Sequence, residues 1–426
     1  MMKKYTLKNG IPVVIDRMEG TKVLTSYVLF NVGSRNETKS INGVSHFLEH
    51  LFFKGTEKRP TTLVLSRELD GVGADFNAFT GKDYTGYYVK VDSRHSMLAL
   101  DILEDLLFHP LFDPEEVNRE RGVIIEEINM YEDNPMATAE EVAEEMLYGK
   151  EHPLGYRIAG PIKNIQTISR NQILKYRETY YHPDNMVIIL SGNVPKNAVQ
   201  VLEKLFGSAP RRKTQSPAPK KFTVKQKAPR LHIEKKKTAQ AHMALTFPGP
   251  SYTDKDALAA TLLSTILGGS MSSRLFINVR ERQGLCYYIG SGVSPYQDVG
   301  AFTIQAGFDK TRINDAIAAI VQEIVDVRDN GVTEQELAQA KEYIRGKLAI
   351  RLEDSEYVAG FWGKQFFHKK SLLSADEYLD ALSKVTSAQV VRFAKKTFQQ
   401  SLANLVIVGE YSEKQRNAFE RLIKQI

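Results

Sequence analysis

The sequence has a single cysteine, Cys286, among its 426 residues, and it has no long apolar run. One cysteine cannot form an internal disulfide, so we expect a fold that does not depend on an oxidising compartment. No segment approaches the roughly 18 consecutive apolar residues that a membrane-spanning helix needs. Residues 1–18 lack both the apolar core of a signal peptide and the arginine- and serine-rich pattern of an organelle transit peptide. These absences predict a soluble cytoplasmic protein.

Acidic and aromatic residues are also scarce in one stretch, residues 211–237, where the excess positive charge is concentrated. The net charge of the chain is +6, and Glu234 is the only acid of this stretch. A nucleic-acid-binding groove would place stacking aromatic side chains among the basic ones. Basic residues interspersed with prolines are instead typical of a solvated linker. We therefore predict a basic, proline-rich linker over residues 211–230 and no nucleic-acid partner.

The linker separates two halves of the chain, residues 1–210 and 231–426, in which the same order of elements is predicted. In the first half, a pair of helices precedes an alternating strand segment, residues 74–91, and a second pair follows it. The second half repeats this order, with strands over residues 285–293 and 300–308. Segments with a hydrophobic period of 2 alternate with segments of period 3.6. We predict an α+β protein of two homologous domains, each a mostly antiparallel sheet with helices packed on one face.

Three polar residues, His46, Glu49 and His50, interrupt the first apolar helix of the first half. Residues i and i+4 of a helix lie on the same face, so both imidazoles can face one metal ion while Glu49 flanks it. The spacing H-x-x-E-H is the inverse of H-E-x-x-H. The corresponding helix of the second half has alanine, leucine, threonine and serine around Ala259 to Ser264. The fold therefore does not need the triplet for packing, and a metal site is favoured over two buried histidines.

Catalytic zinc sites usually have a third protein ligand, and an acidic helix downstream offers two carboxylates. Glu120 and Glu127 fall on one stripe of this helix together with Ile124 and Tyr131, while Glu126 points about 100° away from Glu127. The spacing alone does not say which carboxylate binds a metal. A solvated acidic helix without a site is the alternative.

Six segments between His46 and Ile289, in both halves of the chain, resemble one family. They are HFLEHLFFKGT, NAFTGKDYTGYY, ERGVIIEEI, HPLGYRIAG, YYHPDNM and SRLFINVRERQGLCYYI. Together they look like the pitrilysin/insulinase family of zinc peptidases, the inverzincins. Within this family they are most similar to the branch of half-length chains that includes the mitochondrial processing peptidase. The resemblance implies one zinc ion per chain, with Glu127 as the third ligand and Glu120 as a hydrogen-bond partner of the ligands.

The same resemblance implies hydrolysis of peptide bonds. Zinc would lower the pKa of a water molecule, and Glu49 would act as the general base and then protonate the leaving amine. Arg280 and Tyr287 match a pair that serves the substrate carbonyl in this family. An edge strand that receives the substrate by β-addition is matched by four residues, Phe76, Asn77, Ala78 and Phe79.

Family members of double length have four domains that enclose a chamber, whereas two domains are predicted here. The resemblance therefore implies a homodimer in which Arg280 and Tyr287 of one subunit face the zinc of the other. Peptides or unfolded polypeptides are the expected substrates. Two alternatives stay open: a non-catalytic scaffold or partner subunit of a processing-peptidase-like assembly, and a basic peptide- or nucleic-acid-binding module with a structural metal.

Overall fold

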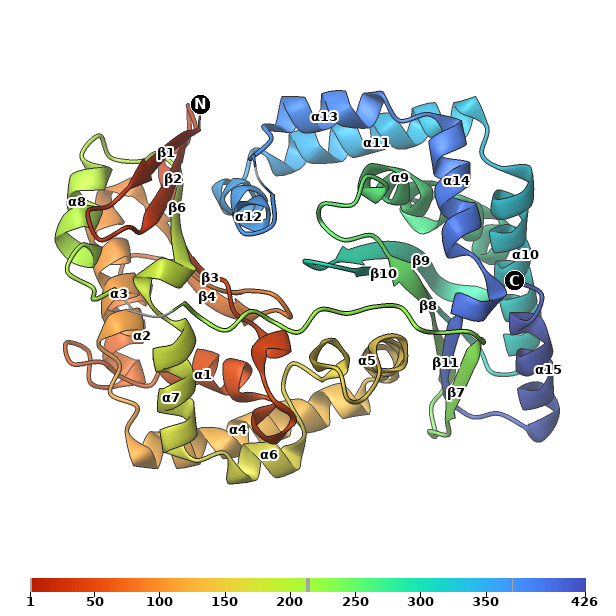
Figure 1. Cartoon of the computed structure of the whole chain (residues 1–426), viewed down its shortest axis with the longest axis horizontal. Coiled ribbons are helices and arrows are strands. Elements are labelled where there is room, and N and C mark those ends of the chain that lie inside the picture. The colour runs from red at the N-terminus through yellow and green to blue at the C-terminus, as the bar shows by residue number, and fades with distance from the viewer. Residues whose placement is uncertain (1, 212–214, 370) are drawn as a thin grey trace. The chain divides into compact units, whose positions relative to one another are not determined.

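The structure is a computed structural model that describes residues 2–211, 215–369 and 371–426. The chain forms two compact units, and each unit is assembled from three segments (Figure 1). Unit 1 comprises Met1–Ile128, Tyr156–Lys220 and Ala349–Leu372, and unit 2 comprises Asn129–Gly155, Lys221–Leu348 and Leu373–Ile426.

Unit 1 contains a six-stranded mixed sheet in the order β1-β2-β6-β3-β5-β4. Neighbouring strands are antiparallel except β2 and β6, which are parallel. In spatial order the strands are β1 (Lys3–Thr6), β2 (Pro12–Arg17), β6 (Met186–Gly192), β3 (Val23–Phe30), β5 (Thr85–Asp92) and β4 (Asp75–Thr80).

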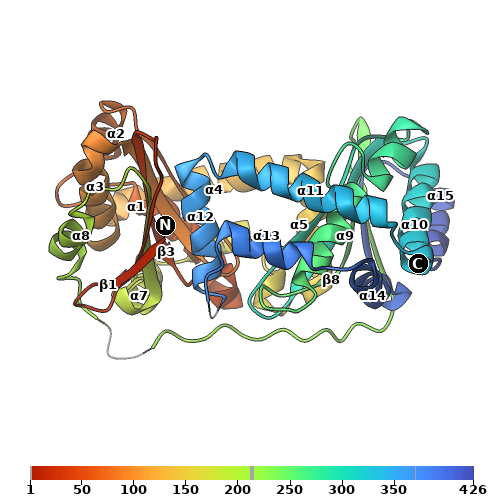
Figure 2. The same cartoon turned by 90° about the horizontal axis from the view of Figure 1, so that it is seen from above.

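Both faces of this sheet are covered. Successive residues of a strand point to opposite sides, and here each side packs against helices. Val28 and Phe30 contribute to a large core with the helices of the first half of the chain, whereas Tyr27 and Leu29 pack toward α12 (Ser355–Phe366). Figure 2 shows α12 beside this sheet. The helices of the first half in unit 1 are α1 (Val44–Phe52), α2 (Thr62–Asp70), α3 (Ser96–Phe108), α4 (Pro114–Asp133), α6 (Ile162–Thr167), α7 (Arg170–Tyr180) and α8 (Ala198–Phe206).

Among the described residues, unit 2 repeats this topology without an equivalent of β1. Its five-stranded sheet has the order β7-β11-β8-β10-β9, and only β7 and β11 are parallel. Its strands are, in spatial order, β7 (Arg230–Glu234), β11 (Asn404–Val408), β8 (Gln240–Gly249), β10 (Gly300–Asp309) and β9 (Cys286–Pro295). Its helices are α5 (Pro135–Tyr148), α9 (Ala257–Gly268), α10 (Ile313–Asn330), α11 (Glu334–Arg351), α13 (Ala375–Ser383), α14 (Ser387–Thr397) and α15 (Glu413–Ile423), with a π-helical turn, η6 (Phe276–Glu281).

The predicted fold of two homologous α+β domains with mostly antiparallel sheets is confirmed. The two sheets have matching orders, with β2, β6, β3, β5 and β4 of unit 1 corresponding to β7, β11, β8, β10 and β9 of unit 2. The structure adds one parallel pair to each sheet and a helix on the second face of each.

The compact units differ from the contiguous halves, residues 1–210 and 231–426, because two helices are exchanged. α5 comes from the first half of the chain but packs Ala139 and Ala143 against β8 and β11 of unit 2. α12 comes from the second half but packs on β3 and β6 of unit 1, where the Trp362 indole N–H donates to Asp16 Oδ2 at 2.8 Å. Burial of apolar faces, rather than proximity in sequence, decides where these helices lie.

The basic stretch predicted as a linker is extended where the structure describes it. Residues 215–229 form neither helix nor strand (Figure 2), and the next element, β7, begins at Arg230. Among the described residues, we find no helix whose length and apolar character would suffice to span a bilayer.

Candidate metal centre

The helix that carries the polar triplet is fixed at its N-terminus by a buried carboxylate. Glu37 accepts hydrogen bonds from the backbone N–H of Gly43 and the backbone N–H of Ser45, each at 2.8 Å. The first N–H groups of a helix have no partner within it, so these bonds satisfy donors that burial would otherwise leave unpaired. Burial raises the pKa of Glu37 to about 7, although these bonds oppose the shift.

Gly43 itself, directly before α1, has a backbone conformation that favours glycine, with φ at 101°. A Cβ here would lie 2.6 Å from the Ala159 carbonyl oxygen and 2.8 Å from Ile165 Cδ1. We expect Gly43→Ala to lower the free energy of unfolding by about 2 kcal/mol or more, because strain and overlap add. Urea unfolding measures this. Gly122→Ala is the matched control: Gly122 lies within α4 with open space around it, so the free energy should rise by up to about 1 kcal/mol. Equal effects of both substitutions on the free energy of unfolding would contradict the conclusion that the backbone at position 43 requires glycine.

The two histidines of α1 and Glu127 of α4 converge. His50 Nε2 lies 3.3 Å from His46 Nε2 and 3.3 Å from Glu127 Oε2, and His46 Nε2 lies 3.6 Å from the same Oε2. The apolar positions of α1, Val44, Phe47, Leu48, Leu51 and Phe52, are buried and hold the helix in the core. Because the apolar and polar residues occupy different faces of α1, burial of one face directs the imidazoles toward α4.

Glu120 and Lys54 fix the orientation of His50. Glu120 is buried, and its Oε1 lies 2.8 Å from His50 Nδ1 while its Oε2 lies 2.7 Å from Lys54 Nζ. An ionised carboxylate can only accept, so Nδ1 donates and Nε2 points into the cluster. Burial raises the pKa of Glu120, but His50 and Lys54 outweigh it and the net shift is downward. Glu120 is therefore an anionic hydrogen-bond partner of His50, and its predicted role beside a zinc ligand stays a prediction.

Neighbouring charges give the two histidines different proton affinities. Burial lowers the pKa of His46 to about 4, and the charge of His50 acts in the same direction. Burial also lowers the pKa of His50, but its bonds to Glu120 and Glu127 outweigh this and raise it to about 9. The hydrogen bond from His50 holds the pKa of Glu127 below its usual value. Since a ligand nitrogen must be unprotonated, a cation in this cluster would replace the proton of His50.

These residues fit zinc. Their ligand atoms, two imidazole nitrogens and one carboxylate oxygen, lie within 4.8 Å of one another, and within residues 2–211, 215–369 and 371–426 no other group of three or more such ligands is found. The set has the composition of catalytic zinc sites with three protein ligands. His46 Nδ1 is buried without a hydrogen-bond partner among the described residues, so only Nε2 of this ring takes part in the cluster. Glu126, the carboxylate next to Glu127 in sequence, is exposed.

Glu49 lies beside the cluster without being one of its ligands. Its Oε2 accepts a hydrogen bond from Thr80 Oγ1 at 2.5 Å, and Thr80 is the last residue of β4. Burial raises the pKa of Glu49, although the bond from Thr80 acts in the opposite direction. A carboxylate with a raised pKa next to a metal site has the properties of a group that takes up and releases a proton.

The remaining predicted site residues lie on two edge strands and a turn. Phe76 to Phe79 belong to β4, which ends the sheet of unit 1 at its free edge. Tyr287 lies on β9, the corresponding edge strand of unit 2, and is 59% exposed. Arg280 lies on η6 with its guanidinium carbon 4.6 Å from the centre of the Phe276 ring. The roles of these residues stay predictions.

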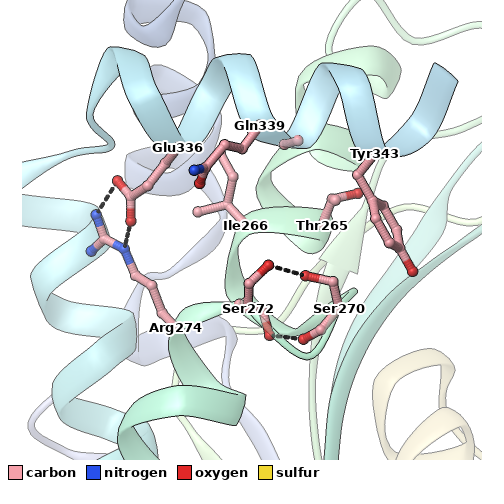
Figure 3. Close-up of a pocket in the computed structure, with 10 residues that line it drawn as sticks. Thr265, Ile266, Ser270, Ser272, Arg274, Glu336, Gln339 and Tyr343 are labelled. Atoms are coloured by element: carbon pink, nitrogen blue, oxygen red, sulfur yellow. Dashed lines mark hydrogen bonds and ion pairs between the residues drawn. The ribbon is translucent and has the colours of Figure 1, made fainter. Parts of the chain in front are cut away.

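Unit 2 has a pocket between α9, the following serine-rich turn and α11 (Figure 3). Arg274 reaches it, but its Nε lies 2.6 Å from Glu336 Oε1 and its Nη1 lies 2.7 Å from Asp326 Oδ2. The guanidinium charge is therefore already compensated. The lining residues labelled in Figure 3 are Thr265, Ile266, Ser270, Ser272, Arg274, Glu336, Gln339 and Tyr343, a set without histidine or cysteine that offers no second zinc site.

Three residues that support the site, Glu37, Lys54 and Thr80, were not predicted from the sequence. Lys54 could have been predicted to lie near the site, because it follows His50 by four residues and so falls on the same face of the predicted helix. Thr80 is four residues after Phe76 in the same strand, so both side chains point to the same face of the sheet. Only the fold shows that this face packs against α1. Glu37 lies outside every predicted helix, and no sequence pattern indicated that it would cap α1.

Comparisons with known proteins match two family models to this chain. The family model described as Insulinase (Peptidase family M16) matches residues 12–162, and the model described as Peptidase M16 inactive domain matches residues 167–344. The ligand group lies within the first match, and the inactive-domain match covers a region of the chain without a triplet.

Relatives and solved structures cover nearly the whole chain. A Bacillus subtilis protein, named uncharacterized zinc protease YmxG, is 36% identical over 96% of this chain and 98% of its own length. A Streptomyces coelicolor protein, also named an uncharacterized zinc protease, is 33% identical over 97% of this chain and 91% of its own. The crystal structure of a protease from Helicobacter pylori covers 96% of this chain and 99% of its own, with a TM-score of 0.91 and 26% identity. The chain belongs to the insulinase family of peptidases, family M16.

Proposed function

We propose that this protein is a zinc metalloendopeptidase that hydrolyses peptides or unfolded polypeptide segments, with one zinc ion per chain. The observation that carries the proposal is the convergence of His46, His50 and Glu127 next to a separate carboxylate, Glu49. The names of the relatives, which call them zinc proteases, support the same metal and reaction class. A non-catalytic scaffold subunit would not need this complete set of groups.

The residues of the site divide the chemistry among them. His46, His50 and Glu127 would hold the ion, which when bound supplies a Lewis acid that activates water and polarises the scissile carbonyl. Glu49 accepts the proton of the attacking water and passes it to the leaving amine. Its raised pKa increases its proton affinity, which favours the first step, the uptake of the proton from water. Glu120 keeps His50 oriented throughout.

The free edge of β4 supports binding of an extended peptide. The backbone N–H of Ala78 donates to the side chain of Asn77 at 2.8 Å. This short-range bond occupies a main-chain donor that a peptide carbonyl can take over when a substrate strand is added to the sheet. Selection by backbone pairing would make cleavage depend on extended conformation more than on a strict sequence code.

We further propose a homodimer in which Arg280 and Tyr287 of one subunit bind the substrate carbonyl at the zinc of the other and complete an enclosed chamber. Both residues lie in unit 2, and the exposure of Tyr287 leaves its hydroxyl available to a partner. A fully active protein that sediments as a monomer would contradict this arrangement.

The proposal includes no nucleic-acid or membrane partner. We also infer a cytoplasmic location, since a fold with Cys286 as its single cysteine needs no disulfide.

Removal and return of zinc tests the proposed function directly. The purified protein should contain about one zinc per chain, and chelation should abolish cleavage of a mixture of unstructured peptides, because Glu49 has no activated water without the ion. Added zinc should restore cleavage. Metal analysis and mass spectrometry of the digest are the measurements. Cleavage that persists after the zinc has been removed would show that another site is responsible.

A further inference from the structure

We propose that Thr80 is a positioning residue for Glu49, and that it ties the orientation of the general base to the strand that would bind the substrate. This inference rests on the proposed function of the site. The hydroxyl of Thr80 donates to Glu49 Oε2 at 2.5 Å, a short bond of the kind expected when the acceptor is ionised. It is the one hydrogen bond to the Glu49 side chain found among the described residues.

The alternation of β4 explains why the hydroxyl faces Glu49. Phe76 and Ala78 point toward the core that contains α1, whereas Phe79 packs on the other face of the sheet near Tyr27. Thr80 has the same parity as Phe76 and Ala78, so its side chain points toward α1 as theirs do. Valine would fit a strand as well as threonine does, so strand formation alone does not require the hydroxyl.

The end of β4 is held in place by the turn that follows it. The carbonyl of Gly81 accepts a hydrogen bond from the backbone N–H of Ser34 at 3.1 Å. Within the turn, Asp83 Oδ1 lies 2.7 Å from Arg35 Nη1, and both side chains are only 1% exposed. A buried and paired ion pair is costly to separate, so the turn has little freedom to move. The donor that reaches Glu49 is therefore presented by a rigid segment of the sheet.

This arrangement leaves the two oxygens of Glu49 with different tasks. Oε2 is held by Thr80, and Oε1 remains available to exchange a proton with water. An unrestrained glutamate samples several rotamers, and a positioned base must occupy the productive one. Because Thr80 belongs to the edge strand, a peptide that pairs with β4 would bind to the same rigid backbone that orients the base. Substrate docking and base orientation thus share one strand.

Kinetics of Thr80→Val and Thr80→Ser, measured on the full chain with zinc bound, test the inference. Valine keeps the shape of threonine without the hydroxyl, and serine keeps the hydroxyl without the methyl group. We expect Thr80→Val to lower kcat at least about tenfold with KM within about twofold, since a hydrogen bond to an ionised group is lost but not a contact to the substrate. Thr80→Ser should stay within about threefold of wild type, and the zinc content of both should be unchanged.

Crystal structures of the zinc-loaded wild type and Thr80→Val provide a readout that does not depend on activity. The Glu49 carboxylate should have one conformation in the wild type and be displaced or multiple in the variant. An unchanged Glu49 in Thr80→Val, a wild-type kcat, or an equal loss in Thr80→Ser would each overturn the inference. A wild type that cleaves no peptide would instead refute the proposed function, and the position of Glu49 in the crystals would still decide the role of Thr80.

Discussion

Replacement of Glu49 by glutamine is expected to reduce the rate of peptide hydrolysis by about 10²- to 10⁴-fold, the usual contribution of a general acid or base. Glutamine has nearly the same size, and its amide oxygen can still accept the hydrogen bond from Thr80. It cannot take up a proton from water. The rate of cleavage of an unstructured peptide mixture, followed by mass spectrometry, measures the loss.

Zinc content distinguishes the loss of a base from the loss of the site. Glu49 is not one of the three converging ligands, so Glu49→Gln should bind about one zinc per chain, as the wild type does. Metal analysis of both proteins after the same dialysis is the control. A Glu49→Gln protein that retains zinc and cleaves peptides at the wild-type rate would defeat the peptidase mechanism, whereas loss of zinc would show that Glu49 is a ligand.

Replacement of Glu127 by glutamine should weaken zinc binding by at least about 10²-fold and abolish cleavage with it. A neutral amide is a poorer ligand than a carboxylate, and a change in the direct ligand should exceed the 10- to 100-fold effect of losing one of its outer partners. Glu127→Gln also removes the negative charge that faces His46 and His50. Competition with a chromogenic chelator measures the affinity.

The chain contains a matched control one residue away. Glu126→Gln changes the net charge by the same amount on the same helix, but Glu126 is exposed and points away from the ligands. Its zinc affinity should stay within about twofold of wild type. The opposite result, with Glu126→Gln losing zinc and Glu127→Gln retaining it, would show that Glu126 and not Glu127 binds the zinc.

The ligand group could be predicted because each step depends on regular local geometry. His46 and His50 are four residues apart, so any helix over this segment places them on one face. Glu120 and Glu127 share a stripe of α4 for the same reason, and the family resemblance then assigned their separate roles. The second half of the chain provided an internal comparison, since its equivalent helix, α9, packs without such a triplet.

The supporting contacts could not be predicted, because they join segments that are far apart in sequence. Thr80 reaches Glu49 across 31 positions, and Glu37 caps α1 from a loop without helical periodicity. The exchange of α5 and α12 has the same origin. Each helix has an apolar face, but the periodicity of a helix does not say which sheet will bury it.

Local sequence patterns were sufficient to predict the repeated α+β design, the polar face of α1 and the carboxylates of α4, because periods of 2 and 3.6 are properties of single segments. The tertiary structure decided which sheet each helix covers, which residue caps α1 and which hydroxyl holds Glu49. These depend on packing between distant segments, where burial of apolar area and pairing of buried polar groups select one arrangement among many that the local patterns allow.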